Sequence, residues 1–153
     1  MAKIKGRDRL RFVLTKMPKE VRRSLRAAIL SAADDVANMQ RRLVPVETGK
    51  LRDSIKVTPG DQDLPRYAQL RSKRQFPDPY LAAIITVGNS EVRYPHLVEF
   101  GTAPHINEGR FPGTLNPGTP PRPFFYPGYR ASKKRAQAKI NSAARKGIRN
   151  GFK

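Results

Sequence analysis

The sequence lacks cysteine and long apolar runs. Without cysteine the chain can form no disulfide, thiolate nucleophile or sulfur-based zinc site, and nothing points to an oxidising compartment. The basic N-terminal segment has none of the apolar core of a signal peptide, and no stretch is long and apolar enough to span a bilayer. We therefore expect a protein that is made inside the cell, is not secreted through a signal peptide and does not span a membrane.

Catalytic and metal-binding residues are also scarce, with only two histidines in 153 residues. His96, Glu99 and His105 could be combined into a metal site. However, Gly101 and Pro104 separate His105 from the other two, and no residues are apparent that would orient the ligands. We expect no metal, no cofactor and no catalytic residue.

The pair Gly49-Lys50 raises the alternative of a phosphate-binding loop. That loop requires a glycine five residues before its Gly-Lys pair and a Ser or Thr after it, whereas this chain has Val44 and Leu51 at those positions. The sequence also lacks a nucleophile elbow. The protein is therefore predicted not to be an enzyme.

Acidic residues are few, with 12 Asp and Glu against 31 Lys and Arg, which gives a net charge of +19. Residues 1–43 carry +8, residues 44–109 carry no net charge, and residues 110–153 carry +11 with no acidic residue at all. A neutral middle between two basic ends is typical of a protein whose flanks face polyanions or acidic protein surfaces.

Apolar residues recur at steps of three and four between Pro18 and Pro45. This spacing predicts an amphipathic helix over 19–43, about 37 Å long at about 1.5 Å per residue. Its apolar positions are Val21, Leu25, Ala28, Ile29, Ala32, Val36, Met39 and Leu43. A shorter helix is predicted over 8–16, and Thr48 is predicted to cap a helical turn that contains Leu51 and Ser54.

Two strands and two long connections follow. Residues 55–58 alternate as a first strand, and the β-branched run over 81–87 predicts a second, buried strand. Residues 59–79 form a long connection between the two strands. Prolines and glycines over 101–123 exclude regular helix and most sheet, which predicts an extended arm or a disordered loop.

From Gly128 onward the pattern predicts a basic C-terminal helix, whose end should fray at Gly147 and at Asn150-Gly151. Its predicted apolar face is Tyr129, Ala136, Ile140, Ala143 and Ile148. Its basic residues are candidates for contacts with DNA or with an acidic partner: Lys133, Lys134, Arg135, Lys139, Arg145, Lys146 and Arg149.

Three short motifs occur in order along the chain. The first consists of Pro45, Thr48, Gly49, Leu51, Ser54 and Ile55; the second of Tyr94, Val98, Glu99, Phe100, Gly101 and Thr102; the third of Arg122, Pro123 and Phe124. In this order and spacing, across roughly residues 18–145, the chain resembles the head-tail joining or tail-completion proteins in the neck of tailed double-stranded DNA bacteriophages and prophages.

The motif residues also have a direct physical interpretation. The two motif glycines suit corners of the backbone. The apolar members are expected in the core: Leu51, Ile55, Val98, Phe100 and Phe124. Glu99 is expected to satisfy backbone donors or an arginine rather than to act as a base.

The resemblance implies a structural virion protein at the phage neck or tail end, assembled in the host cytoplasm. It would form a ring, expected to be a hexamer, that completes the tail and joins it to the DNA-filled head. Its partners would be further copies of itself, head-connector and tail-tube or terminator proteins, and packaged DNA without sequence specificity. The alternative function is that of a nonspecific nucleic-acid-binding basic protein.

The expected fold class is α+β, with a long N-terminal amphipathic helix packed on a small, mainly antiparallel sheet, long loops and a basic C-terminal helix. The length fits a single domain over 1–153. Along the chain we expect an N-terminal extension (1–17), the long helix and first strand (18–58), an extended loop (59–79), a core strand and turn (80–102), a Pro/Gly-rich arm (103–123) and the basic C-terminal helix (124–153).

Overall fold

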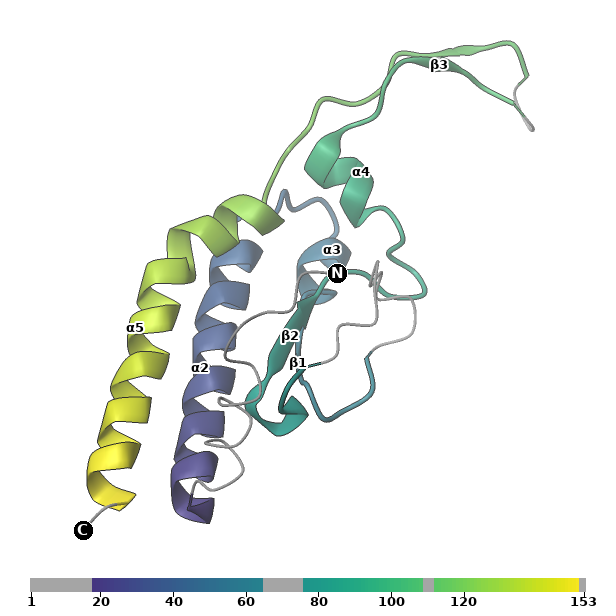
Figure 1. Ribbon diagram of the computed structural model, residues 1–153. Coiled ribbons are helices and arrows are strands. Elements are labelled where there is room, and N and C mark those ends of the chain that lie inside the picture. Colours follow the sequence, from purple (N-terminus) through teal and green to yellow (C-terminus); the bar gives the residue numbers. More distant parts are fainter. Residues whose placement is uncertain (1–17, 65–75, 109–111, 152–153) are drawn as a thin grey trace, which may run out of the picture.

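The computed structural model describes residues 18–64, 76–108 and 112–151. Two long helices, α2 (Lys19–Leu43) and α5 (Phe125–Gly151), lie side by side and run in opposite directions (Figure 1). A small two-stranded sheet contacts α2. The predicted α+β fold is therefore confirmed, while the helix predicted over 8–16 lies outside the described residues.

Helix α2 has the predicted bounds. It begins directly after Pro18 and ends before Val44, whose backbone is extended. The buried positions follow the predicted stripe in part: Val21, Leu25, Ala32, Val36, Ala37 and Gln40. Gln40 is a polar exception at 1% exposure, and its Nε2 donates a hydrogen bond of 3.0 Å to the carbonyl oxygen of Phe125. Leu43, at the end of the predicted stripe, is instead exposed.

The sheet pairs strand β1 (Lys56–Pro59) with strand β2 (Ala83–Thr86) in antiparallel register, with Val57 opposite Ile85. Both strands were predicted, but their ends differ. Leu81 belongs to the 3-10 turn η1 (Pro79–Leu81), where Asp78 caps the turn by accepting the Tyr80 N–H. Strand β2 is also only partly buried along most of its length, rather than fully buried as predicted.

A short helix, α3 (Lys50–Asp53), joins α2 to β1, as predicted. The predicted cap is wrong. The residue that precedes α3 is Gly49, whose φ of 78° lies in the left-handed region, and no side chain caps the helix. Thr48 is exposed at the surface.

Helix α5 differs from its prediction at both ends. It begins at Phe125, three residues before Gly128, and it continues through Gly147 without a break. Both glycines are buried against α2: a Cβ on Gly128 would lie 2.7 Å from Gln40 Cγ, and one on Gly147 would lie 2.8 Å from Val21 Cγ1. The helices approach too closely for larger side chains, which is why Gly147 is a packing position rather than a frayed end.

This close approach also changes which residues of α5 face α2. Ser132 is buried between the two glycines, whereas Tyr129 and Ile148 are 44% and 50% exposed. The other predicted positions, Ala136, Ile140 and Ala143, are half-buried, while the fully buried residues within the described turns of α5 are all small: Gly128, Ser132 and Gly147.

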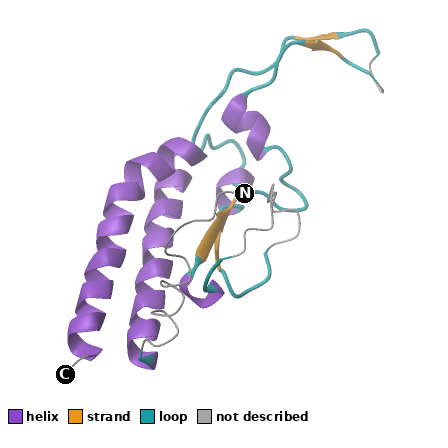
Figure 2. Cartoon of the chain, in the orientation of Figure 1, coloured by secondary structure: helices purple, strands orange, loops and turns teal. Residues whose placement is uncertain are grey.

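A slender arm leaves the body between the sheet and α5. Helix α4 (Pro95–Phe100) forms its base, and strands β3 (His105–Ile106) and β4 (Leu115–Asn116) pair as an antiparallel hairpin further out. Figures 1 and 2 show this hairpin well beyond the ends of the long helices. The predicted arm is confirmed over its described residues, with two-residue strands as its regular structure.

Candidate functional site: the motif core, the arm and the basic helix

The three sequence motifs meet in the hydrophobic core. Phe124 of the third motif is fully buried and belongs to the same cluster as Leu51 and Ile55 of the first. Val98 of the second motif packs against this cluster as a partly buried residue. Residues separated by more than 70 positions in the sequence therefore form one structural unit.

Ser54 links the first motif to the segment after β2. Its hydroxyl donates to the carbonyl oxygen of Leu51 at 2.7 Å and accepts from the Gly88 N–H at 3.2 Å. Because the hydroxyl is buried and both of its bonds are internal, the side chain fixes the corner between α3 and β1 and leaves no group free for chemistry.

Glu99 joins the second motif to the third. Its carboxylate accepts hydrogen bonds from the N–H groups of Phe124 (2.8 Å), Phe125 (2.8 Å) and Tyr126 (3.0 Å), at the start of α5. These are N–H groups that a helix leaves without an internal partner, and the negative charge also favours this end of the helix dipole. The side chain thus takes the role of a helix cap supplied from a distant part of the chain.

This arrangement agrees with the expectation that Glu99 satisfies backbone donors. The carboxylate is buried at 7% exposure, and both of its oxygens accept bonds from α5. Neither His96 nor His105 joins it, and His105 Nδ1 lies 3.1 Å from the carbonyl oxygen of Ala103 on the arm. Within the described ranges, no three His, Asp or Glu side chains gather as a metal site requires.

A tight crossing of two backbone segments forms the foot of the arm. Gly101 has a φ of 71°, and a Cβ there would lie 2.6 Å from the carbonyl oxygen of Thr119. Thr102 pairs with Thr119 through two backbone hydrogen bonds, and the Thr119 N–H also reaches the Thr102 hydroxyl. The Arg122 N–H donates to Val98 at 2.8 Å. The second and third motifs therefore fasten both ends of the arm.

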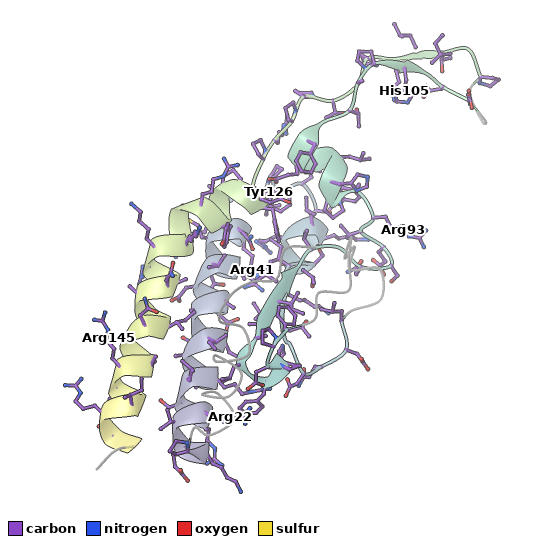
Figure 3. All side chains as sticks on the ribbon, in the orientation of Figure 1. Arg22, Arg41, Arg93, His105, Tyr126 and Arg145 are labelled. Atoms are coloured by element: carbon purple, nitrogen blue, oxygen red, sulfur yellow. The ribbon has the colours of Figure 1, made fainter. Side chains whose placement is uncertain are left out.

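The prediction that Phe100 belongs to the core is wrong. Its side chain is 67% exposed, because α4 directs Glu99 inward and so turns the next residue outward. The Phe100 ring lies 6.1 Å from the ring of Tyr126, which is also exposed and marks the junction of arm and α5 in Figure 3. Leu97 on the same short helix is 41% exposed. We call Leu97, Phe100 and Tyr126 the base patch.

A second exposed apolar group lies further out on the hairpin. Ile106 and Leu115 face each other as a cross-strand pair and are 65% and 73% exposed. We call these two residues the tip pair. The sequence indicated neither group: prolines and glycines conceal the short paired strands that present the tip pair, and the base patch joins residues of α4 and α5 that are distant in the sequence.

The predicted loop over 59–79 is tied to α2 at both of its described ends. Arg26 forms a two-pronged ion pair with Asp61 at 2.8 and 2.9 Å, and Arg22 contacts Asp78 at 2.6 Å. The Arg26 guanidinium also lies over the Tyr80 ring, 4.1 Å from its centroid. The hydrogen bond from Arg26 lowers the pKa of Asp61. Residues 65–75 of this loop lie outside the described part of the chain.

The basic residues of α5 divide between two faces. Lys139 faces α2, where its Nζ contacts Asp35 (2.7 Å) and the Ser31 hydroxyl (2.7 Å), and this hydrogen bond lowers the pKa of Asp35. The other candidates from the sequence are exposed: Lys133, Lys134, Arg135, Arg145, Lys146 and Arg149. Arg130, which was not among the candidates predicted from the sequence, is exposed as well.

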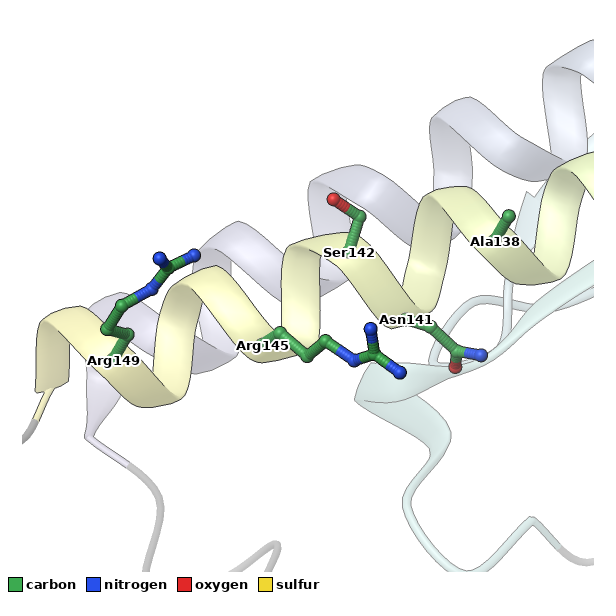
Figure 4. Close-up of a pocket in the computed structure, with 5 residues that line it drawn as sticks. All are labelled: Ala138, Asn141, Ser142, Arg145 and Arg149. Carbon is green, nitrogen blue, oxygen red and sulfur yellow. The ribbon is translucent and has the colours of Figure 1, made fainter.

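A shallow depression lies on the surface of α5 away from α2. Figure 4 shows its lining residues, which come from successive turns of this single helix: Ala138, Asn141, Ser142, Arg145 and Arg149. All five are exposed, and Arg145 points away from α2 in Figure 3. The depression therefore offers two guanidinium groups, an amide and a hydroxyl to solvent.

In the part of the chain that the structure describes, neither long helix has an apolar stretch sufficient for a membrane crossing.

Comparison with known protein families gives a match over the N-terminal part of the chain. Residues 8–101 match the HK97-gp10-like family, described as "Bacteriophage HK97-gp10, putative tail-component". No curated protein and no solved structure matches the chain. The matched range includes the first motif and Tyr94–Gly101 of the second, whereas most of the arm and all of α5 lie beyond it. The match spans well over half of the sequence and confirms the expected relationship to phage tail proteins: the chain belongs to the HK97-gp10-like family.

Proposed function

We propose that the protein is a non-catalytic structural component of the virion that forms a ring at the neck or tail end, completes the tail and joins it to the DNA-filled head. The family supports the broader role, that of a phage tail component. The observation that carries the ring is the arm, with exposed apolar groups at its foot and near its tip.

An arm of this kind is unfavourable in an isolated subunit. A lone two-stranded hairpin is marginally stable in water, and apolar side chains gain nothing from exposure. Single exposed apolar residues are common, but here the base patch and the tip pair place five of them on the arm and at its junction with α5. Such grouping marks a protein contact surface.

Charge favours a second copy of the chain as the occupant. Over residues 94–128 the charged residues are two glutamates and two arginines, so this stretch is neutral although the whole chain carries +19. Copies can therefore touch through their arms without bringing their basic surfaces into direct contact, which like charges would oppose.

The tip pair and the base patch are different surfaces of one chain. We propose that the tip pair of one copy packs on the base patch of the next. A contact between unlike surfaces is head-to-tail, and it closes into a ring when the rotation between copies closes. Burying Ile106 and Leu115 would contribute roughly 3–6 kcal/mol per contact, at about 1.5–3 kcal/mol for each side chain.

Electron microscopy and native mass spectrometry of the full chain test this proposal. We expect closed rings for the wild type and subunits for the double variant Ile106→Asp/Leu115→Asp, because each lost contact should weaken association about 10²–10⁴-fold. Val46→Asp is the matched control, since Val46 is 58% exposed on the loop between α2 and α3. Rings that form equally well from the double variant would refute the role of the arm.

The rival function, nonspecific nucleic-acid binding as the main role, draws on the exposed basic residues of α5. The two functions predict different oligomeric states of the isolated protein. Monomers that bind duplex DNA tightly, and never form rings at high protein concentration, would favour the rival over the joining role.

A further inference from the structure

We propose that the outward face of α5 binds the phosphate backbone of duplex DNA. The face opposite α2 carries Arg130, Lys134, Arg145 and Arg149, all exposed. Their separations of 4, 11 and 4 residues each correspond to nearly whole turns, so the four cations form one stripe. At about 1.5 Å per residue this stripe runs for roughly 29 Å along the helix.

The stripe has no counter-charge on its own helix. Residues 110–153 contain no acidic residue, and among the described ion pairs the only one made by α5 belongs to Lys139, which faces α2. Arg145 and Arg149 lie one turn apart, an arrangement in which like charges destabilise a helix. A bound anion between them would remove this repulsion, so the spacing favours a ligand that carries regularly placed negative charges.

The depression beside these arginines has the chemistry of a phosphate contact. Ala138 lies at one end of its lining and Arg149 at the other; between them Asn141 places an amide beside the guanidinium group of Arg145, and Ser142 adds a hydroxyl (Figure 4). Arginine with Ser and Asn side chains is the set that commonly contacts phosphate oxygens in protein–DNA complexes. Contacts to phosphate oxygens carry no sequence information, so the proposed binding is independent of sequence.

The composition of the stripe favours DNA over an acidic protein. Protein interfaces depend on buried aromatic and apolar anchors, and Ile148 is the only large apolar residue exposed on α5 beyond Tyr129 within its described turns. Protein–DNA interfaces are instead polar and strongly positive. The contrast with the neutral, apolar arm is clear: one chain carries a surface suited to proteins and a separate surface suited to nucleic acid.

Salt dependence of binding to a 30-base-pair duplex of arbitrary sequence tests this proposal, by fluorescence anisotropy with the full chain. Each phosphate contact contributes about 0.9 to the slope of log K against log salt concentration. Arg145→Gln/Arg149→Gln removes two contacts and should therefore reduce the slope by about 1.8. If the variant and the wild type bind equally at 1 M salt, the variant should bind roughly 60-fold more weakly at 0.1 M salt. The conservative variant Arg145→Lys/Arg149→Lys should keep most of the wild-type slope.

The matched control is Arg23→Gln/Arg42→Gln, which removes the same charge from exposed positions on α2. A slope that falls equally in the control and in the α5 variant would overturn the proposal, because net charge alone would then explain binding. Absence of binding by the wild type at physiological salt would overturn it as well and would favour an acidic protein partner. Repeating the titration with Ile106→Asp/Leu115→Asp tests DNA binding independently of ring formation. A subunit that cannot assemble still carries the stripe and should still bind DNA.

Discussion

Replacing Glu99 should destabilise the protein strongly, because its buried carboxylate caps the start of α5. The carboxylate accepts three N–H groups, of which that of Phe124 is buried and those of Phe125 and Tyr126 are partly buried. Hydrogen bonds to a charged acceptor contribute roughly 1.5–3 kcal/mol each. Three bonds at the lower value give a loss of about 4.5 kcal/mol. In Glu99→Ala, water can hydrogen-bond to the two partly buried N–H groups, which should reduce this loss by about 1 kcal/mol.

We therefore expect Glu99→Ala to lower the free energy of unfolding by about 3–4 kcal/mol. Glu99→Gln should cost about 2 kcal/mol, because the amide oxygen can still accept two bonds whereas its NH₂ group faces the third donor. Urea denaturation at one fixed protein concentration measures both values, since assembly would otherwise shift the apparent stability.

Hydrogen exchange gives a local measurement of the same prediction. The amide protons of Phe124, Phe125 and Tyr126 should exchange faster in Glu99→Gln, while those in the middle of α2 follow the global change alone. Glu91→Gln is the control. Its carboxylate is 72% exposed and lies 3.6 Å from Lys50, so its loss should cost less than about 0.5 kcal/mol. A Glu99→Ala protein within about 1 kcal/mol of wild type would refute the cap.

Two further predictions concern the packing of α5 and the behaviour of the chain in acid. Gly128→Ala should lower the free energy of unfolding, measured by urea denaturation, by about 2 kcal/mol despite the better helix propensity of alanine, because the new Cβ would meet Gln40, including its backbone Cα at 3.0 Å. The control Ser142→Ala, on the exposed face of α5, should leave stability unchanged. A Gly128→Ala protein as stable as wild type would contradict this packing. Asp35 and Asp61 have pKa values below their ordinary 3.8, so the stability from their ion pairs is complete above that pH and is lost as the pH falls through the lower folded-state values. Between about pH 5 and about pH 2 the free energy of unfolding should therefore fall less steeply for Asp35→Asn/Asp61→Asn than for wild type. If it falls equally steeply for both proteins, the two ion pairs make no such contribution.

Local signals in the sequence were sufficient for the body of the fold. The bounds of α2 follow from apolar spacing between two prolines, the first strand follows from alternation over 55–58, and the second follows from a β-branched run. These predictions succeeded because each depends on residues close together in the chain. The start of α5 could not be predicted in this way, since Glu99, which caps it, lies about 25 positions earlier on another helix.

The incorrect predictions have related causes. Gly147 lowers helix propensity, and only the contact with Val21 shows why the position must be small. Phe100 was assigned to the core by residue type alone, whereas the direction of α4 decides which of two neighbouring residues faces inward. For the candidate sites, sequence indicated that α5 is basic but not which of its cations face solvent, a distinction that depends on the packing partner of the helix.

The double fastening of the arm has a consequence for how freely its sequence can vary. Because the Thr102–Thr119 pairing, the Arg122–Val98 hydrogen bond and the Glu99 cap close the arm at its foot, the segment beyond behaves as a loop with fixed ends. The entropy of closing such a loop varies slowly with length, so halving or doubling it changes stability by only about 0.6 kcal/mol. Insertions, deletions and substitutions in the arm should thus change the stability of the helices and the sheet very little. If the arm makes the contacts proposed above, changing about twenty residues would alter them while the helices and sheet stay as they are.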